Sequence, residues 1–299
     1  MLDAHFLAGI AAGLTGTVVL YPLELLKTRM QVADGTLPEY ANLRNSIKSV
    51  LRNEGYGGLY KGITPAVMAA TGSWGGYFYF YEKSKKRKCI SQGLDPVTAK
   101  LGATDHLLAG VEAGSIMVCL FNPLWLLKTR LALQDAKGLN QIGAASTATQ
   151  PRYTGVINAF RTIIREEGIA GLYQGLFPAL LLTSHGAVQF ASYEYMKVRM
   201  QETMATSEQP AWVSVLLGGT SKIVASTATY PYQVMKSRLQ QRGIEGTYVY
   251  SSSFDCVRHT WKLEGARGFF RGLIPNVMKV TPSAALTFVV YEETLKLLK

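Results

Sequence analysis

A threefold repeat constrains the fold of this chain more than any other feature of its sequence. A proline is followed five residues later by a lysine and seven residues later by an arginine, and this pattern begins at Pro22, Pro123 and Pro231. Downstream of each proline come a glutamate–glycine step and then an aromatic residue, a polar residue and a glycine. Self-similarity at a fixed period is typical of tandem structural units that pack against one another. The predicted units are residues 1–100, 101–207 and 208–299, which together form one domain.

Each unit contains two long stretches with almost no charge. Three of the six stretches have no lysine, arginine, aspartate or glutamate, and the other three have one each, namely Glu112, Lys222 and Lys279. About 20 residues of helix cross a bilayer core of roughly 30 Å. We therefore predict an all-α membrane protein with six transmembrane helices. The stretches are residues 6–23, 62–81, 106–127, 175–193, 209–235 and 272–291.

A short amphipathic segment separates the two stretches of each unit. In the first unit Leu43, Ile47, Val50 and Leu51 are spaced as on one face of a helix. We expect each such segment to form a short helix on the membrane surface. The segments are residues 42–53, 156–166 and 254–263.

The charge balance and the remaining motifs argue against other classes of protein. The chain has 31 basic and 20 acidic residues, but in a membrane protein such charges orient helices and attract anionic lipids or solutes, so no nucleic-acid partner is expected. Cys89, Cys119 and Cys256 lie far apart and the histidines are scattered, so we expect no metal and no cofactor. The sequence has no phosphate-binding loop, dinucleotide-binding motif or zinc-protease motif, so we do not expect an enzyme.

With these repeats the chain resembles the mitochondrial carrier family, in which the motifs Px[DE]xx[KR]x[KR] and [DE]Gxxxx[WYF][KR]G occur three times. The resemblance covers essentially the whole chain. It implies a threefold pseudosymmetric, monomeric helix bundle that spans the mitochondrial inner membrane and binds cardiolipin. It also implies transport of one small-molecule solute at a time by alternating access between two gates.

The matrix gate is expected where the three proline-containing helices meet. A proline removes one backbone hydrogen bond and bends its helix, so Pro22, Pro123 and Pro231 are predicted kinks that let the helices converge. The resemblance implies that the acid after one proline pairs with the lysine of the next repeat. This gives a pair of Glu24 with Lys128.

Two acid positions of the matrix gate are occupied by other residues. Trp125 and Gln233 stand where the family has an acid, which leaves Lys236 and Lys27 without carboxylate partners. We therefore expect a weak matrix gate. With the two glutamines that brace such pairs in the family, the predicted gate comprises Glu24, Lys27, Gln31, Trp125, Lys128, Gln233, Lys236 and Gln240.

The cytoplasmic gate of the family carries the motif [FY][DE]xx[KR] in the second helix of each repeat. Two copies are complete here, and the third has Leu295 where a cation belongs. The resemblance implies pairs of Glu82 with Lys197 and of Glu292 with Lys85. Two pairs on this side against one on the matrix side favour a matrix-open resting state. The predicted cytoplasmic gate comprises Tyr81, Glu82, Lys85, Tyr193, Glu194, Lys197, Tyr291 and Glu292.

Lys279 is the strongest candidate for a solute-binding residue. A lone cation near the middle of a membrane span is costly and usually faces a cavity or an anion. The equivalent positions in the other repeats are Leu181 and Ala69, and the resemblance makes all three contact points for the solute. One cation and two apolar positions suit an anion with a flat hydrophobic portion. Lys222 replaces a helix-packing glycine, so it must reach water, a lipid phosphate or the cavity.

Aromatic residues on the second predicted helix offer a surface for such a flat group. Trp74, Tyr77, Phe78 and Tyr81 recur at three- and four-residue steps, and their rings could stack on a ring system or pack against lipid and neighbouring helices. The predicted substrate-binding set is Lys279, Ala69, Leu181, Leu182, Trp74 and Lys222.

Local similarity narrows the expected solute. Several short segments resemble the folate and FAD transporter branch of the family, which grades into carriers of NAD and pyrimidine nucleotides. We therefore expect an anionic cofactor-like solute, FAD or folate, with NAD or a pyrimidine nucleotide as the alternative. A degenerate carrier that acts as a scaffold and a proton leak are further alternatives. The segments are residues 73–75, 123–125, 184–187, 221–223, 228–233 and 287–291.

The glycine that closes each aromatic–polar–glycine step is a candidate for lipid binding. Gly62, Gly175 and Gly272 each precede the second predicted span of their repeat. Free backbone N–H groups at the start of a helix can hold a phosphate. The resemblance implies that this phosphate belongs to cardiolipin.

Overall fold

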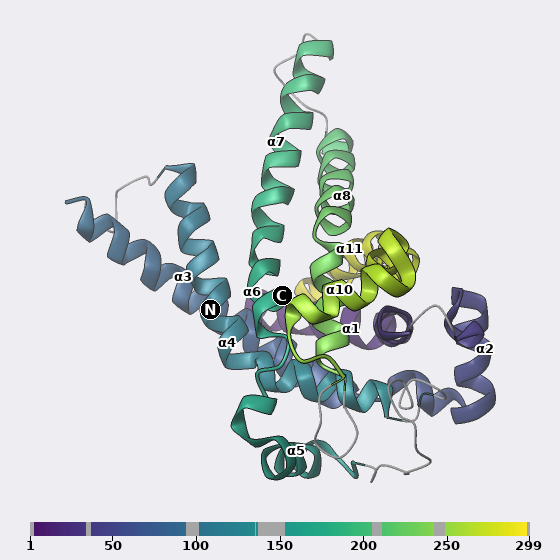
Figure 1. Ribbon diagram of the computed structural model, residues 1–299. Helices are drawn as coiled ribbons and strands as arrows, with labels where there is room; N and C mark the ends of the chain where they lie inside the picture. Colours follow the sequence, from purple (N-terminus) through teal and green to yellow (C-terminus); the bar gives the residue numbers. More distant parts are fainter. Residues whose placement is uncertain are drawn as a thin grey trace.

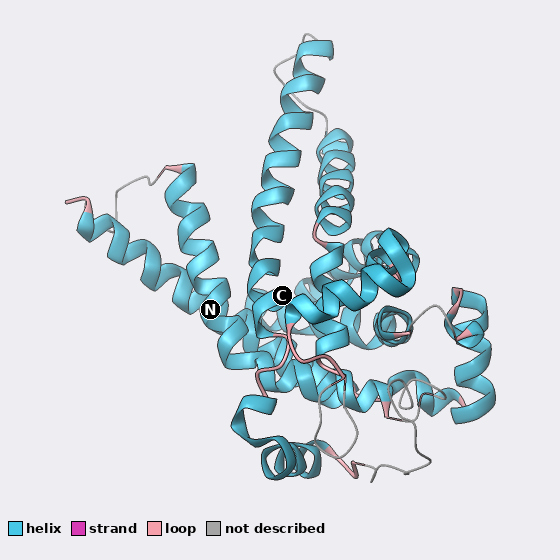
Figure 2. Ribbon diagram, in the orientation of Figure 1, coloured by secondary structure: helices cyan, strands magenta, loops and turns pink. Residues whose placement is uncertain are grey.

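The computed structural model describes residues 3–33, 37–93, 102–134, 136, 153–204, 211–241 and 249–297, and all regular structure in these ranges is helical (Figures 1 and 2). The first repeat has α1 (Asp3–Val32), η1 (Pro38–Tyr40), α2 (Leu43–Glu54), η2 (Tyr56–Tyr60) and α3 (Ile63–Ser91). The second has α4 (Ala103–Leu133), α5 (Val156–Gly171), α6 (Leu176–Leu181), η4 (Leu182–Ser184) and α7 (His185–Met204). The third has α8 (Ala211–Ala228), α9 (Tyr230–Leu239), α10 (Ser253–Glu264), η5 (Gly265–Phe270) and α11 (Leu273–Leu297). The predicted all-α fold is confirmed.

Each repeat has a long helix, a short helix and a second long helix, as the sequence predicts. The short helices α2, α5 and α10 occupy the amphipathic segments. Their starts follow from local chemistry, because the side chains of Asn42 and Ser252 accept a hydrogen bond from the backbone N–H three residues later. These caps satisfy donors that the first turns of α2 and α10 would otherwise leave unpaired.

The prolines of the repeat motif affect their helices differently. Pro231 lies in the first turn of α9, directly after a break at Thr229, so the third repeat has the predicted interruption. Pro22 and Pro123 lie inside α1 and α4, and each of these helices is continuous through its proline.

A second interruption, which the sequence did not predict, divides α6 from α7. The hydroxyl groups of Thr183 and Ser184 each donate a hydrogen bond to the carbonyl three residues earlier, at 2.7 Å. This spacing matches the tighter 3₁₀ turn η4, where the α-helical hydrogen-bond ladder is interrupted.

The long helices of different repeats pack side by side in a closed ring. α3 lies along α4, α7 along α8, and α11 along α1, so the second long helix of each repeat packs against the first long helix of the next. Figure 1 shows the α3–α4 and α7–α8 pairs leading away from a common base in different directions. The contact of α11 with α1 joins the last repeat to the first.

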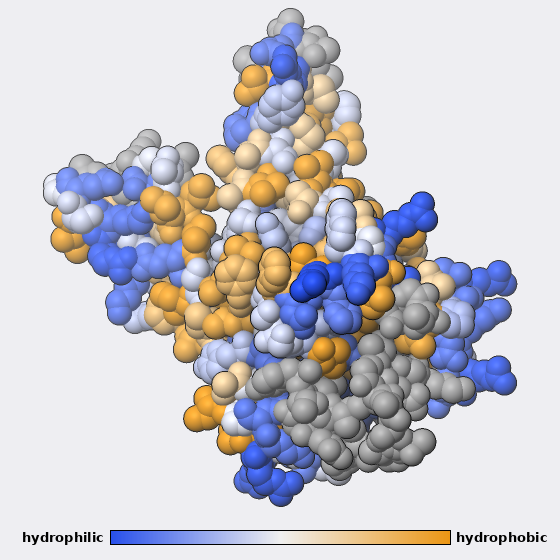
Figure 3. Space-filling view, viewed as in Figure 1, coloured by the Kyte–Doolittle hydropathy of each residue, from blue (hydrophilic) through white to orange (hydrophobic). Residues whose placement is uncertain are grey.

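Hydrophobic side chains cover part of the outer surface. Figure 3 shows them over the middle of the α3–α4 pair, with hydrophilic side chains at the far end of α3 and on α2. Phe78 and Tyr79 on α3 and Leu120 on α4 are among the exposed ones. Of the described helices, only the segment Thr104–Leu133 has the length and apolar composition needed to cross a membrane, with a mean hydropathy of 1.6. Six membrane spans therefore stay a prediction.

Candidate functional site

Residues of the predicted matrix gate meet where the three repeats converge. The carboxylate of Glu24 accepts hydrogen bonds from two lysines, because Lys128 Nζ lies 2.8 Å from Oε1 and Lys279 Nζ lies 2.7 Å from Oε2. One acid from the first repeat thus joins a lysine from the second repeat to a lysine from the third. The expected contact between Glu24 and Lys128 is present. Lys279, expected to be a lone cation in the solute site, instead belongs to this cluster.

Trp125 supplies a partner of a different kind to the gate lysines. Lys236 Nζ lies 5.3 Å from the centroid of the Trp125 ring, and Lys128 Nζ lies 5.8 Å from it. Both distances are within the range in which the negative face of an indole attracts an ammonium group. In the described part of the chain Lys27 and Lys236 form no ion pair, as the missing acids predict. The ring of Trp125 therefore stands at the acid position in the sequence, and it attracts Lys236 as an acid there would.

The two brace glutamines each connect two repeats. Gln31 Oε1 accepts a hydrogen bond from Ser237 Oγ at 2.7 Å, and Gln240 Oε1 accepts one from Thr129 Oγ1 at 2.9 Å. The first contact joins repeats one and three, and the second joins repeats three and two. The side chain of Gln233, in contrast, makes no hydrogen bond among the residues that the structure describes.

Three buried arginines, which sequence reasoning missed, tie the short helices to the gate helices. The arginine that ends each proline motif forms an ion pair with the glutamate at the end of the short helix in its own repeat. These pairs are Arg29 with Glu54, Arg130 with Glu167 and Arg238 with Glu264. The signal for them was present in the sequence, because both residues recur in phase in all three repeats.

The same arginines also reach into the neighbouring repeat. Arg29 Nε donates to the carbonyl of Ala132 at 2.9 Å, and Arg238 Nε donates to the carbonyl of Gln31 at 3.0 Å. Arg130 Nε makes the corresponding contact with the carbonyl of Gln240 at 3.3 Å. Each acceptor lies nine residues after the motif proline of the next repeat in the ring, the position of Gln31, Ala132 and Gln240. The arginines thus hold the three repeats together at the predicted matrix gate.

Glu54 shows the electrostatic effect of this arrangement. Its carboxylate contacts Arg29 and, at 2.6 Å, Lys61 Nζ. Burial alone would raise the pKa of Glu54, but the hydrogen bonds and charges of Arg29 and Lys61 outweigh burial and hold this pKa below its ordinary value. Glu54 is therefore ionised at neutral pH.

The three candidate lipid-binding glycines are packed against the gate helices. Gly62, Gly175 and Gly272 precede α3, α6 and α11 with φ angles of 81°, 72° and 78°. A Cβ at Gly62 would lie 2.8 Å from the carbonyl oxygen of Lys128, and one at Gly272 would lie 3.0 Å from that of Lys27. Both the left-handed backbone and the close approach of the next repeat therefore require glycine here. Lipid binding at these positions stays a proposal.

The predicted pairs of the cytoplasmic gate are not formed in this structure. Lys85 Nζ lies 3.0 Å from Oε1 of Glu82, one turn away on the same helix, instead of pairing with Glu292. Lys197 and Glu292 have no ion-pair partner within the described ranges. The reason is that α3, α7 and α11 lie in three different helix pairs, two of which visibly diverge (Figure 1). The structure thus has the predicted matrix-side pair of Glu24 with Lys128 formed and the predicted cytoplasmic pairs unformed. A matrix-open resting state stays a prediction.

Tyrosines of the cytoplasmic gate and the predicted solute contacts occupy varied surroundings. Tyr81 contacts His106 across the α3–α4 pair. Tyr193 and Glu194 are partly exposed on α7, and Tyr291 is partly exposed on α11.

The predicted solute contacts lie on several elements. Ala69 is buried on α3, and Leu181 and Leu182 are partly buried where α6 meets η4. Lys222 is exposed on α8. Trp74 lies in α3, but its side chain is outside the described part of the structure.

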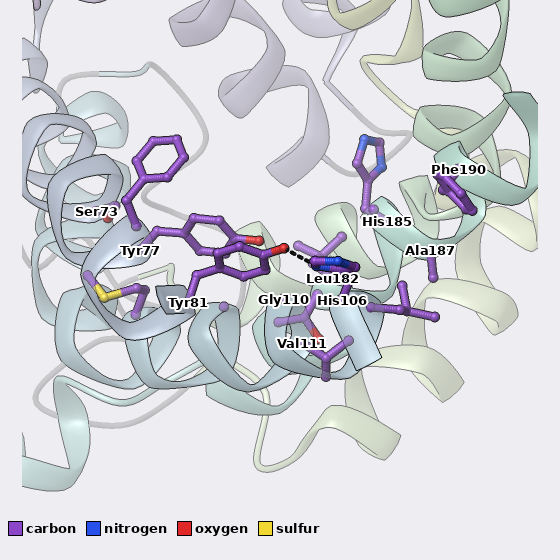
Figure 4. Close-up of a pocket in the computed structure, with 16 residues that line it drawn as sticks. Ser73, Tyr77, Tyr81, His106, Gly110, Val111, Leu182, His185, Ala187 and Phe190 are labelled. Carbon is purple, nitrogen blue, oxygen red and sulfur yellow. Dashed lines mark hydrogen bonds between the residues drawn. The ribbon is translucent and has the colours of Figure 1, made fainter. Parts of the chain in front are cut away.

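A cavity of about 1010 Å³ opens between the α3–α4 pair and α7 (Figure 4). Tyr77 and Tyr81 from α3 and His106 from α4 line one side, and Leu182, His185 and Phe190 line the other. The Nδ1 atom of His185 lies 3.1 Å from the hydroxyl of Thr229, at the break between α8 and α9. Of the predicted substrate-binding set, Leu182 lines this cavity and Lys279 does not.

Comparison with known proteins agrees with this arrangement of three repeats. The family model described as "Mitochondrial carrier protein" matches residues 3–90, 99–204 and 207–299. A relative named "Folate transporter 1, chloroplastic" from Arabidopsis thaliana is 42% identical over 98% of this chain and 94% of its own length. "Nicotinamide adenine dinucleotide transporter 1, chloroplastic" from the same plant is 35% identical over 95% of this chain and 88% of its own length.

A third relative extends the comparison to fungi. "Mitochondrial nicotinamide adenine dinucleotide transporter 1" from Saccharomyces cerevisiae is 32% identical over 96% of this chain and 74% of its own length. Together with the three matched repeats, these similarities exceed what a shared fold alone would produce. The chain therefore belongs to the mitochondrial carrier family, and it is a solute transporter and not an enzyme.

Proposed function

We propose that this chain carries an anionic cofactor-like solute, FAD or folate, across a membrane by alternating access. The observation that carries the proposal is the bridge from Glu24 to both Lys128 and Lys279, at the point where the three repeats meet. It couples a gate lysine to the cation expected to bind the solute. NAD or a pyrimidine nucleotide is the second candidate, because two of the relatives are named as NAD transporters.

The bridge suggests how the solute opens the matrix gate. Lys279 is about one-third exposed, and we propose that an anionic group of the solute reaches its ammonium group. A phosphate or carboxylate there competes with Glu24 for the same donor. Once Lys279 is engaged, Glu24 holds only Lys128, and one of the two ion pairs that join the repeats is lost. Solute binding therefore weakens the gate that must open next.

The membrane context of the proposal comes from the family. We infer that six helices span the mitochondrial inner membrane, that the carrier is a monomer and that cardiolipin binds near Gly62, Gly175 and Gly272. The relatives are named as chloroplastic, mitochondrial and peroxisomal proteins, so the membrane must be established by localisation of the protein in cells.

Uptake into liposomes tests the proposed function. The purified protein is reconstituted and screened with radiolabelled folates, FAD, NAD and pyrimidine nucleotides. Lys279→Ala should abolish uptake of the transported solute, and Lys279→Arg should retain part of it, because the charge survives while the donor geometry changes. Lys296→Ala is the matched control, since Lys296 lies on the same helix α11 in an exposed pair with Glu293.

Three outcomes would contradict the proposal. Lack of uptake of every anion by the unmodified protein would favour a scaffold. Dissipation of a pH gradient without solute would favour a proton leak. Equal uptake by the Lys279→Ala and Lys296→Ala variants would remove Lys279 from the solute site.

A further inference from the structure

Three nearly parallel aromatic rings line one side of the cavity between α3, α4 and α7. The rings of Tyr77 and Tyr81 are nearly parallel, at 14°, with centroids 6.0 Å apart. The imidazole of His106 lies at 23° to the Tyr81 ring, and its Nδ1 atom is 2.8 Å from the Tyr81 hydroxyl oxygen. Because this hydrogen bond joins α4 to α3, two helices hold the three rings in place (Figure 4). We call Tyr77, Tyr81 and His106 the aromatic wall.

Two glycines next to the aromatic wall keep the cavity wide. Gly110 and Gly114 of α4 line it. A Cβ atom at Gly110 would lie 3.2 Å from the Tyr77 hydroxyl, and one at Gly114 would lie 3.5 Å from Cγ2 of Thr183. A larger side chain at Gly110 would therefore press on Tyr77, and one at Gly114 would fill space beside Thr183.

The side of the cavity opposite the aromatic wall is mostly apolar, with Thr183 and His185 as its polar residues. Leu182, Ala187 and Phe190 come from η4 and α7 and face the wall across the cavity (Figure 4). No lysine, arginine, aspartate or glutamate is among the described residues that line the cavity. Its volume of about 1010 Å³ lies at the upper end of the roughly 300 to 1,000 Å³ found for small-molecule sites. This composition suits an uncharged flat group and does not suit the anionic part of a solute.

We propose that the aromatic wall binds a planar, uncharged heterocyclic ring of the solute by stacking, apart from the lysines that bind its anionic groups. This inference rests on the proposed function, because it concerns the same solute. It adds a ring site beside the contact positions expected from the sequence, since Leu182 lines this cavity but Ala69 and Lys279 do not. It also restricts the solute to anions that carry a planar heterocycle.

Binding of an isolated ring tests this site. Lumiflavin is an uncharged fused heterocycle whose fluorescence falls when it stacks on an aromatic side chain. The full-length purified protein should quench it saturably. Tyr77→Leu should raise the dissociation constant about 2- to 12-fold, the range expected for loss of one aromatic contact. Tyr77→Phe should bind as tightly as the unmodified protein, because the ring is kept.

Tyr79 provides a matched control for the loss of a tyrosine from α3. Its ring is exposed and does not line the cavity, so Tyr79→Leu should leave lumiflavin binding unchanged. The melting temperature of each variant shows whether it is folded. If the Tyr77→Leu protein is unfolded, Tyr81→Leu, on the same wall, takes its place in the comparison.

Three results would overturn the inference, and none depends on the uptake assay. One is the absence of saturable quenching by the unmodified protein up to the solubility limit of lumiflavin. Another is an equal dissociation constant for the Tyr77→Leu and Tyr79→Leu proteins. Pyrophosphate, which competes only for lysines, should not displace lumiflavin, and displacement would also contradict a separate ring site. Failure of uptake with intact lumiflavin binding would contradict the proposed function alone.

Discussion

Trp125 shows, at the scale of single residues, how a gate can hold its lysines after an acid is replaced. A cation over an indole ring contributes roughly 0.5 to 2 kcal/mol. That range overlaps the roughly 0 to 1 kcal/mol of a partly solvated ion pair. A count of carboxylates therefore underestimates the interactions in the predicted matrix gate. The Trp125 ring contacts Lys236 and Lys128, and Glu24 bridges two lysines. The predicted matrix-open resting state therefore rests on an incomplete count of the contacts in this gate.

Substitution of Trp125 tests this contribution. Trp125→Leu keeps an apolar side chain but removes the ring face, so the melting temperature of the purified protein in detergent should fall. Trp125→Phe should lie between the leucine variant and the unmodified protein, because a benzene ring attracts cations less strongly than an indole. Trp212→Leu is the control, since Trp212 is exposed on α8. If all three variants melt together with the unmodified protein, the ring face contributes nothing to the gate.

At the scale of elements, the arginine–glutamate pairs explain how the short helices α2, α5 and α10 are positioned. Each pair connects the end of a short helix to a buried arginine of a long helix, and the arginine is in turn bonded to the next repeat. Loss of one partner from a buried pair leaves an uncompensated charge, which costs about 3 to 5 kcal/mol. We expect these pairs to determine the stability of the bundle more than its exposed ion pairs do.

The pH dependence of stability provides a test at Glu54. The folded-state pKa of this carboxyl lies below its ordinary value of 4.5, so its contribution to stability is complete above that pH. The contribution is lost as the pH falls from 4.5 through the lowered folded-state value. Glu54→Gln should therefore melt at a lower temperature than the unmodified protein at pH 7, and the difference should shrink below pH 4.5. A difference that does not change with pH would show that the carboxylate charge is not the stabilising feature.

At the scale of the whole molecule, the repeat could be found from the sequence because its motifs recur in order. The short amphipathic helices could also be located from the sequence, because the apolar spacing of each one is visible within its own segment. The break at η4 could not be found in this way, since it depends on hydroxyl groups of one repeat only. The double bridge at Glu24 was missed for a different reason, because no motif links Lys279 to Glu24 and its place in a long uncharged stretch pointed to the solute instead.

The pairing of the cytoplasmic gate marks a further limit of sequence reasoning. Residue types and spacing show which charges can pair, but in the proposed alternating access the pairs of the two predicted gates form in different states. The structure shows one arrangement, with Glu24 joined to Lys128 and with Glu82 joined to a lysine of its own helix. The same sequence is compatible with both states, so it does not determine which of them the structure adopts.

The balance between the two states gives the last prediction. Gln233→Glu could pair with Lys27, which has no ion pair among the described residues, and should stabilise the arrangement seen here. Leu295→Lys could pair with Glu194 and should favour the matrix-open state. Each added pair contributes roughly 0 to 1 kcal/mol, so each substitution should shift a two-state population at most several-fold.

Cysteine accessibility measures this shift. A variant without Cys89, Cys119 and Cys256 carries Ser73→Cys in the cavity, and a membrane-impermeant thiol reagent is added from the cytoplasmic side. Labelling should become faster with Gln233→Glu and slower with Leu295→Lys. Leu297→Lys adds the same charge at an exposed position two residues further along α11, so it should leave the rate unchanged. Because the two gate substitutions act on opposite gates, a shift of both rates in the same direction would show that ion pairs do not determine which gate is closed.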